Sequence, residues 1–219
     1  VEEALKTKVL EIYQEAEDNL ARIAKFAEEE YVYRAELKAA PSQTRRLQKE
    51  IESNQQKNGK PKSEDWGSIP TAELEQRLII EKSKAASLDD QIKAKETELV
   101  EQNSRPQLIR EEIVAAKQAI ETDQNQLSVT IAGMTSPLER EARQIALKTA
   151  IDRRAAELKM LEAEALSNPA RADLLKIELQ WLEIKKNELA PFIETIEGVL
   201  AERRQKEARQ IQEALSQAE

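Results

Sequence analysis

The side chains of this chain that could support acid–base chemistry are carboxylates, and they occur mainly beside one another in the sequence. Glu28-Glu29-Glu30, Asp89-Asp90 and Glu111-Glu112 are the clearest groups. Two carboxylates share acid and base roles only where their environments separate their pKa values. Adjacent residues of a helix point about 100° apart, so these groups do not converge on one point. The pattern is typical of a solvated helix face with charge pairs four residues apart.

Other kinds of catalytic or metal site lack their residues. The 219 residues include no His and no Cys, which excludes a conventional Ser-His triad, a thiolate nucleophile, a thiolate metal site and a disulfide. The 4 glycines are isolated, so there is no glycine-rich phosphate loop. A Ser83-Lys84 dyad is formally possible, but the heptad pattern predicts that it faces solvent. We therefore predict no enzyme activity and no catalytic, cofactor-binding or metal-binding residues.

The composition indicates long helices. Charged residues make up 35% of the chain, above the usual quarter, and aromatic residues only 3%. The net charge of −8 argues against a nucleic-acid partner, which needs a basic face. No stretch approaches the roughly 18–20 apolar residues that cross a bilayer, and the acidic start Val1-Glu2-Glu3 is unlike a secretory signal. We expect a cytosolic protein or a processed part of a larger one.

Apolar residues recur at spacings of four and three, which predicts helices that pack against other helices. The first such seam lies at residues 5, 9, 12, 16, 20, 23 and 27, and the second runs from Leu74 to Leu99. A third runs from Ile109 to Met134, with Asp123 inside it, and the last from Leu175 to Leu200. These seams predict an all-α fold: an elongated antiparallel helical bundle made of coiled-coil hairpins.

Proline and polar stretches set the expected boundaries. We expect elbows near 41, 105, 135 and 168, a flexible loop near 53–68, and a kink or break near Ala190, before Pro191. Ser136-Pro137 with Glu139 is the clearest helix start, because Ser caps and Pro occupies the first helical position. The predicted domains are 1–70, a helical hairpin, and 71–219, long helical hairpins whose C-terminal helix projects.

The few aromatic residues are candidates for contacts. Trp181 and Trp66 suit either the edge of a helix–helix interface or a partner hot spot, and we favour the edge. We expect Trp66 to fold back onto the bundle. Tyr13, Tyr31 and Tyr33 lie on the first predicted helix and are a candidate exposed patch.

The order of several segments resembles a known family. These segments are Pro70 to Leu78, which opens a long helix, Leu99 to Pro106, the Ser136-Pro137 elbow, and Ile193 to Ala208 in the closing helix. The order is similar to the N-terminal periplasmic region of the large MscS-like mechanosensitive channels of Gram-negative bacteria, the MscK type and its relatives. That helical region is called the porin domain. The resemblance covers most of the chain and is best from about 70 to 208.

The resemblance implies a periplasmic domain of a bacterial inner-membrane channel, with a structural or regulatory role in the response to osmotic shock. It implies a ring of seven subunits as partners, possible envelope partners, no pore in this chain, and membrane contact only through segments outside it. The alternative is a coiled-coil scaffold or a periplasmic adaptor unrelated to channels. Transmembrane spans after residue 219 in the full protein would favour the channel.

Overall fold

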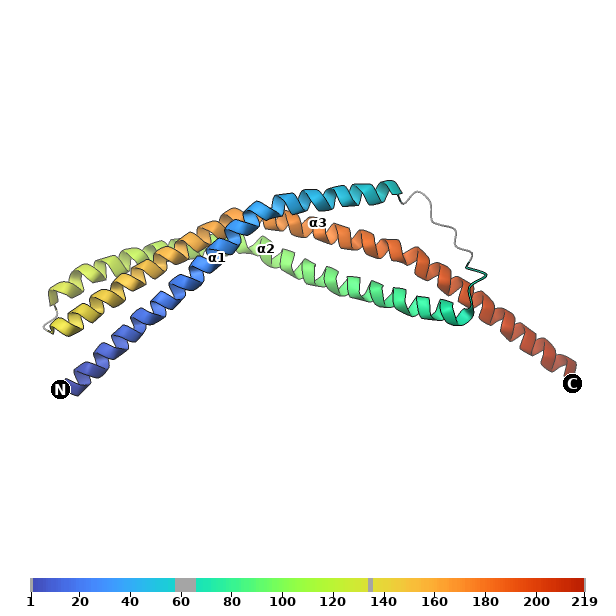
Figure 1. Cartoon of the computed structure of the whole chain (residues 1–219), viewed down its shortest axis with the longest axis horizontal. Coiled ribbons are helices and arrows are strands. Elements are labelled where there is room, and N and C mark those ends of the chain that lie inside the picture. Colours follow the sequence, from blue (N-terminus) through green and yellow to red (C-terminus); the bar gives the residue numbers. More distant parts are fainter. Residues whose placement is uncertain (1, 58–65, 134–135, 219) are drawn as a thin grey trace. The chain divides into compact units, whose positions relative to one another are not determined.

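The computed structural model describes residues 2–57, 66–133 and 136–218, and these ranges are almost entirely helical. The helices are α1 (Glu2–Lys57), α2 (Thr71–Gly133) and α3 (Pro137–Ala218), followed in chain order in Figure 1. No strand occurs in these ranges. The prediction of an all-α helical bundle is confirmed.

Three of the expected elbows are absent, because the helices continue through the prolines. Pro41 lies inside α1, Pro106 inside α2 and Pro169 inside α3, so the breaks expected near 41, 105 and 168 do not occur. A proline removes one backbone hydrogen bond and costs about 3 kcal/mol in a helix. The cost is offset here because neighbouring residues are held by packing: Ala40 is 2% exposed and Asn168 is 5% exposed. α3 also continues through Pro191, so there is no break at Ala190.

The boundary expected near 135 falls between the end of α2 and the start of α3. Ser136 Oγ accepts a hydrogen bond from the Glu139 backbone N–H at 3.4 Å, as an N-cap does. The Glu139 carboxylate forms an ion pair with Lys8 of α1. Of the loop expected near 53–68, residues 53–57 belong to α1, residues 58–65 lie outside the described ranges, and 66–68 form a turn.

The three helices divide into two compact units that do not follow the predicted division at residue 70. Unit 1 contains Val1–Ser42 and Val100–Asp173, and unit 2 contains Gln43–Leu99 and Leu174–Glu219. Each helix therefore contributes one segment to each unit. The domains 1–70 and 71–219 remain a prediction.

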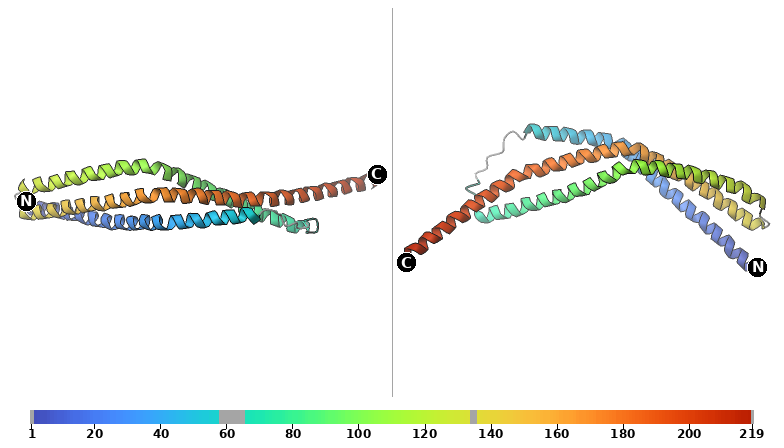
Figure 2. Two further views of the ribbon diagram at one scale, coloured as in Figure 1. Left: turned by 90° about the horizontal axis from the view of Figure 1, so that it is seen from above. Right: turned by 180° about the vertical axis from the view of Figure 1, so that it is seen from behind.

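In unit 1, α1 runs parallel to α3, and α2 runs antiparallel to α3. Asn19 bonds Thr149 and Glu36 pairs with Arg171, so residue numbers rise together along α1 and α3. Arg105 bonds Glu164 and Gln102 bonds Asn168, so they run in opposite directions along α2 and α3. Figure 2 shows the α2 and α3 segments of this unit side by side.

Unit 1 has two apolar clusters. One contains Val9, Ile12, Ala16, Ala142 and Ala146; the other contains Ile109, Met160 and Leu161, with Phe26, Tyr33 and Ile113 packed against it. The expected seam of α1 is wrong at Leu20, which is 55% exposed while Asn19 is buried, and the next seam residue, Ile23, is half-buried. The larger Phe26 supplies the next apolar contact, and the Asn19 amide donates to Thr149 Oγ1 at 3.4 Å, which satisfies a polar group in the interface.

In unit 2, α2 and α3 pack antiparallel along the predicted seams. Leu74, Ile196 and Leu200 form its core cluster, against which Trp66, Ile69, Leu78 and Val199 pack. Ion pairs at Lys95–Glu178 and Arg204–Glu75 confirm the antiparallel direction. Trp66 folds back onto the bundle, as expected. Beyond Arg203, residues 204–217 of α3 are all exposed.

The cluster around Ile109 gives a test of the packing in unit 1. Ile109 is 1% exposed, so Ile109→Ala leaves a cavity and should lower the free energy of unfolding by about 2–5 kcal/mol. Denaturant unfolding followed by circular dichroism measures this. The control is Val114→Ala on the same helix, because Val114 is 54% exposed and its truncation should cost less than about 0.5 kcal/mol. Equal losses in both variants would contradict the buried position of Ile109.

Candidate functional site: a buried polar cluster between two helices

The carboxylate groups singled out in the sequence lie in separate ion pairs. Glu30 accepts a hydrogen bond from Arg34 at 2.7 Å, Asp89 pairs with Lys186, and Glu112 accepts from Arg105. Lys84 donates to Glu81 at 2.7 Å on an exposed face, so its ammonium is already bonded to a carboxylate beside Ser83. In the described part of the chain, no group of three or more acidic residues is arranged to hold a metal ion.

The densest polar contacts join α2 to α3 in unit 1. We call this group the polar cluster and define it as Gln102, Arg105, Glu164 and Asn168. Gln102, Glu164 and Asn168 are 4–7% exposed. Buried polar groups are costly unless they are hydrogen-bonded, so the partners of each one matter.

Arg105 binds two carboxylates at once. Its Nε donates to Glu164 Oε1 at 2.7 Å and its Nη2 donates to Glu164 Oε2 at 2.9 Å, a bidentate pair across the interface. Nη1 and Nη2 also donate to the two oxygens of Glu112, at 2.8 and 2.7 Å. The hydrogen bonds to Glu164, followed in strength by those to Glu112, raise the pKa of Arg105 above its ordinary value. The guanidinium is thus permanently charged, and four of its five N–H donors bond to carboxylates.

Gln102 and Asn168 exchange hydrogen bonds between side chain and backbone. The Asn168 amide donates to the Gln102 backbone carbonyl at 3.0 Å, and the Gln102 amide donates to the Asn168 carbonyl at 3.4 Å. In a helix, the Gln102 carbonyl would accept from the N–H four residues later, but that residue is Pro106, which has none. Asn168 therefore supplies the donor that Pro106 lacks.

Arg171 connects the same region to α1. Its guanidinium carbon lies 5.1 Å from the centre of the Tyr33 ring, a cation–π distance, and its Nε lies 3.0 Å from Glu36 Oε2. Burial raises the pKa of Tyr33, and the negative charge of Glu164 raises it further. All three helices of unit 1 thus meet at this level.

The seam position Asp123 lies in a second, charged layer of unit 1. Burial lowers the pKa of Arg153, and the neighbouring charges of Arg154 and Arg22 lower it further, whereas Glu157 and Asp123 act in the opposite sense. The Asp123 carboxylate therefore acts electrostatically on Arg153 of α3, which accounts for a charged residue within an otherwise apolar seam.

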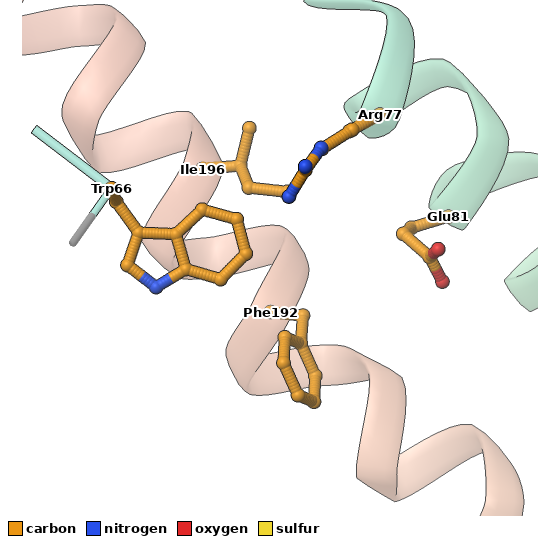
Figure 3. A pocket seen from close by; sticks show the side chains of 5 residues that line it. All are labelled: Trp66, Arg77, Glu81, Phe192 and Ile196. Atoms are coloured by element: carbon orange, nitrogen blue, oxygen red, sulfur yellow. The ribbon is translucent and has the colours of Figure 1, made fainter. Parts of the chain in front are cut away.

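A small cavity of about 180 Å³ lies in unit 2 (Figure 3) and is lined by Trp66, Arg77, Glu81, Phe192 and Ile196. Trp66 and Phe192 meet edge to face, with ring centres 6.3 Å apart. The volume is below the roughly 300–1,000 Å³ of ordinary ligand pockets. The Trp66 side is anchored by Arg203, which donates to the Gly67 carbonyl at 2.8 Å and to Thr71 Oγ1 at 3.0 Å. The cavity is therefore part of the packing that holds this turn.

The remaining aromatic candidates do not form one surface. Tyr13 packs on the cluster around Ile12, Tyr33 on the cluster around Ile109, and only Tyr31 is strongly exposed, at 75%. Trp181 is partly buried, with the Lys185 ammonium 5.7 Å from its ring centre. The three tyrosines are therefore not a common contact patch.

Sequence reasoning missed the polar cluster. The only local signals are the prolines: Gln102 stands four residues before Pro106, and Asn168 directly precedes Pro169. An elbow was expected near 168, whereas Asn168 lies inside α3 and bonds to α2. Pairing across 66 residues depends on helix register, which the residues alone do not fix.

The fold and these contacts define an all-α coiled-coil bundle domain. No described helix is both long enough and apolar enough to span a membrane. Over residues 1–219 the chain matches the sequence model of the mechanosensitive ion channel porin domain, MscS_porin. The chain belongs to this family, which confirms the resemblance. No curated protein and no solved structure matches the chain.

The Glu164 pair gives a test of the polar cluster. Glu164→Ala removes two charge-assisted hydrogen bonds across the interface and leaves Arg105 bonded to Glu112, so it should lower the free energy of unfolding by about 1.5–3 kcal/mol. The side chain of Glu164 is 6% exposed and that of Glu112 is 45% exposed. Glu112→Ala is therefore the matched control, with an expected loss below about 1 kcal/mol. Denaturant unfolding measures both, and a larger loss for Glu112→Ala would refute this assignment.

The raised pKa of Tyr33 gives a test at alkaline pH. The folded protein holds the Tyr33 proton more tightly than the unfolded chain, so this contribution to stability is present below the ordinary pKa of 10.0 and is lost as pH rises through the folded value. Tyr33→Phe should remove the latest tyrosinate absorbance in a titration and flatten the alkaline loss of stability. Tyr31→Phe is the control and should leave that late component in place. A late component that survives Tyr33→Phe would contradict the assignment.

Proposed function

We propose that this chain is a periplasmic, extramembrane domain of an MscS-like mechanosensitive channel, with a structural and regulatory role rather than a catalytic one. The observation that carries the proposal is the family match over residues 1–219. In this role the domain acts during osmotic shock as part of a bacterial inner-membrane protein, without forming the pore itself.

Contacts spaced along the helices support a mechanical role. In unit 1, interhelical contacts occur at Lys8–Glu139, Asn19–Thr149 and Arg171–Glu36 along one helix pair. Apolar clusters lie between them, and interlocked side chains resist sliding because protein interiors are close-packed. A displacement at one end of such a bundle is carried along it.

The partners in this proposal are other subunits of the same channel, arranged as a ring of seven, with further envelope proteins as additional partners. Exposed apolar side chains such as Tyr31, Ile79 and Val129 offer contact area for such partners.

Removal of residues 1–219 from the full-length channel tests the regulatory role. The pore lies elsewhere in that protein, so single-channel conductance should stay the same. We expect the membrane tension for half-activation to fall, because a bundle that must be displaced on opening adds to the work of gating. Patch recordings from spheroplasts under graded suction measure both quantities. An unchanged tension threshold would rule out a regulatory role.

A second experiment tests on which side of the membrane the domain lies. The chain has no Cys, so Tyr31→Cys, at a side chain that is 75% exposed, gives this region a single reactive thiol in the full-length channel. A membrane-impermeant maleimide should label it in intact cells whose outer membrane has been permeabilised. Labelling only after lysis of the inner membrane would place the domain in the cytoplasm and overturn the proposal.

A further inference from the structure

Each of the three helices carries one internal proline in unit 1, and all three prolines lie near the end of that unit's segment. Pro41 is one residue before Ser42, Pro106 is six residues after Val100, and Pro169 is four residues before Asp173, which are the limits of the unit 1 segments. Interior prolines are uncommon in helices because each one removes a backbone hydrogen bond and clashes with the preceding turn. Their coincidence at one end of the unit is therefore a property of the bundle and not of a single helix.

Each proline removes one hydrogen bond from its helix. The carbonyls that lose their donor lie four residues earlier, at Leu37, Gln102 and Ala165. Helices bend most readily at prolines, where a carbonyl is freed and the ring pushes against the preceding turn. Each helix is thus weakened near the same level.

Most side chains that are buried within one turn of the prolines are small or polar. They are Ala40, Gln102, Ser167, Asn168 and Ala172, each 7% exposed or less, and Ile109, three residues after Pro106, is the large apolar exception. Small side chains make few dispersion contacts across an interface, so large interlocked groups do not hold this level. The neighbouring cluster of Ile109, Met160 and Leu161 is of the opposite kind.

The contacts that do hold the level are polar and join different helices. Asn168 of α3 donates to the carbonyl that Pro106 frees in α2, at 3.0 Å. Arg105 of α2 binds Glu164 of α3, and Arg171 of α3 contacts Tyr33 and Glu36 of α1. A displacement of one helix therefore alters its contacts with the other two.

We propose that Pro41, Pro106 and Pro169 form one compliant level of the bundle, at which the three helices open and bend together, and that the polar cluster fixes its resting geometry. This inference goes beyond the proposed function, because it concerns the 219-residue chain by itself. It holds or fails independently of what the chain is attached to.

Amide hydrogen exchange of the 219-residue chain tests the proposal, because exchange reports local opening. Amides in the turn before each of the three prolines should exchange faster than the amides of Met160 and Leu161, which lie two turns before Pro169. Pro106→Ala restores a donor for the Gln102 carbonyl and favours the helix. It should slow exchange near Pro106 about fivefold, since one hydrogen bond is worth roughly 1 kcal/mol. It should also slow exchange near Pro41 and Pro169, because the level opens as one.

Two further variants complete the design. Asn168→Ala removes the donor to Gln102 and should speed exchange in all three helices at this level. Pro191→Ala is the matched control, because Pro191 is an exposed proline inside α3 that belongs to unit 2. It should leave exchange around the three prolines unchanged. Slowing confined to α2 in Pro106→Ala would show separate kinks and overturn the proposal. Equal protection of the amides at the proline level and those of Met160 and Leu161 would overturn it too.

Discussion

The buried carboxylate of Glu164 constrains the part of unit 1 around it, because a charge taken out of water must be fully bonded. Arg105 meets that requirement with a bidentate pair and holds Glu112 with its remaining donors. Such a pair tolerates only one register between α2 and α3, since a shift by one residue would strand the charge. This register places the Asn168 amide opposite the Gln102 carbonyl, where it replaces the hydrogen-bond donor that Pro106 lacks.

In this channel domain, the polar side chains between α2 and α3 are bonded within the domain. Arg105 and Glu164 bind each other, and the Gln102 and Asn168 amides bind the backbone, so they are committed to structure. In unit 2, Arg203 likewise donates hydrogen bonds to the Gly67 carbonyl and to Thr71 Oγ1, and so fixes the turn before α2. The polar groups described here thus set the register and the joints of the bundle.

Features that depend on neighbouring residues could be predicted from the sequence, whereas contacts between helices could not. The Ser136 cap and the buried seam residues Leu74 and Ile109 follow from short-range rules of capping and periodicity. The prolines were wrongly expected to end helices. That rule describes an isolated helix, whereas packing between the helices keeps them continuous here. Asn19 in place of Leu20 on the buried face of α1 shows the same limit, because Thr149, its partner, lies 130 residues away.

The separation in sequence of the helix pairs sets an order for folding. α2 and α3 meet through pairs such as Arg105 and Glu164, 59 residues apart, and their ends at Gly133 and Pro137 are close along the chain. α1 meets α3 through Asn19 and Thr149 only after 130 residues have been synthesised between them. Closing the longer loop costs more chain entropy, and distant contacts form later. We therefore expect the α2–α3 hairpin to assemble first and to provide the surface on which α1, the first of the three helices to be translated, docks last.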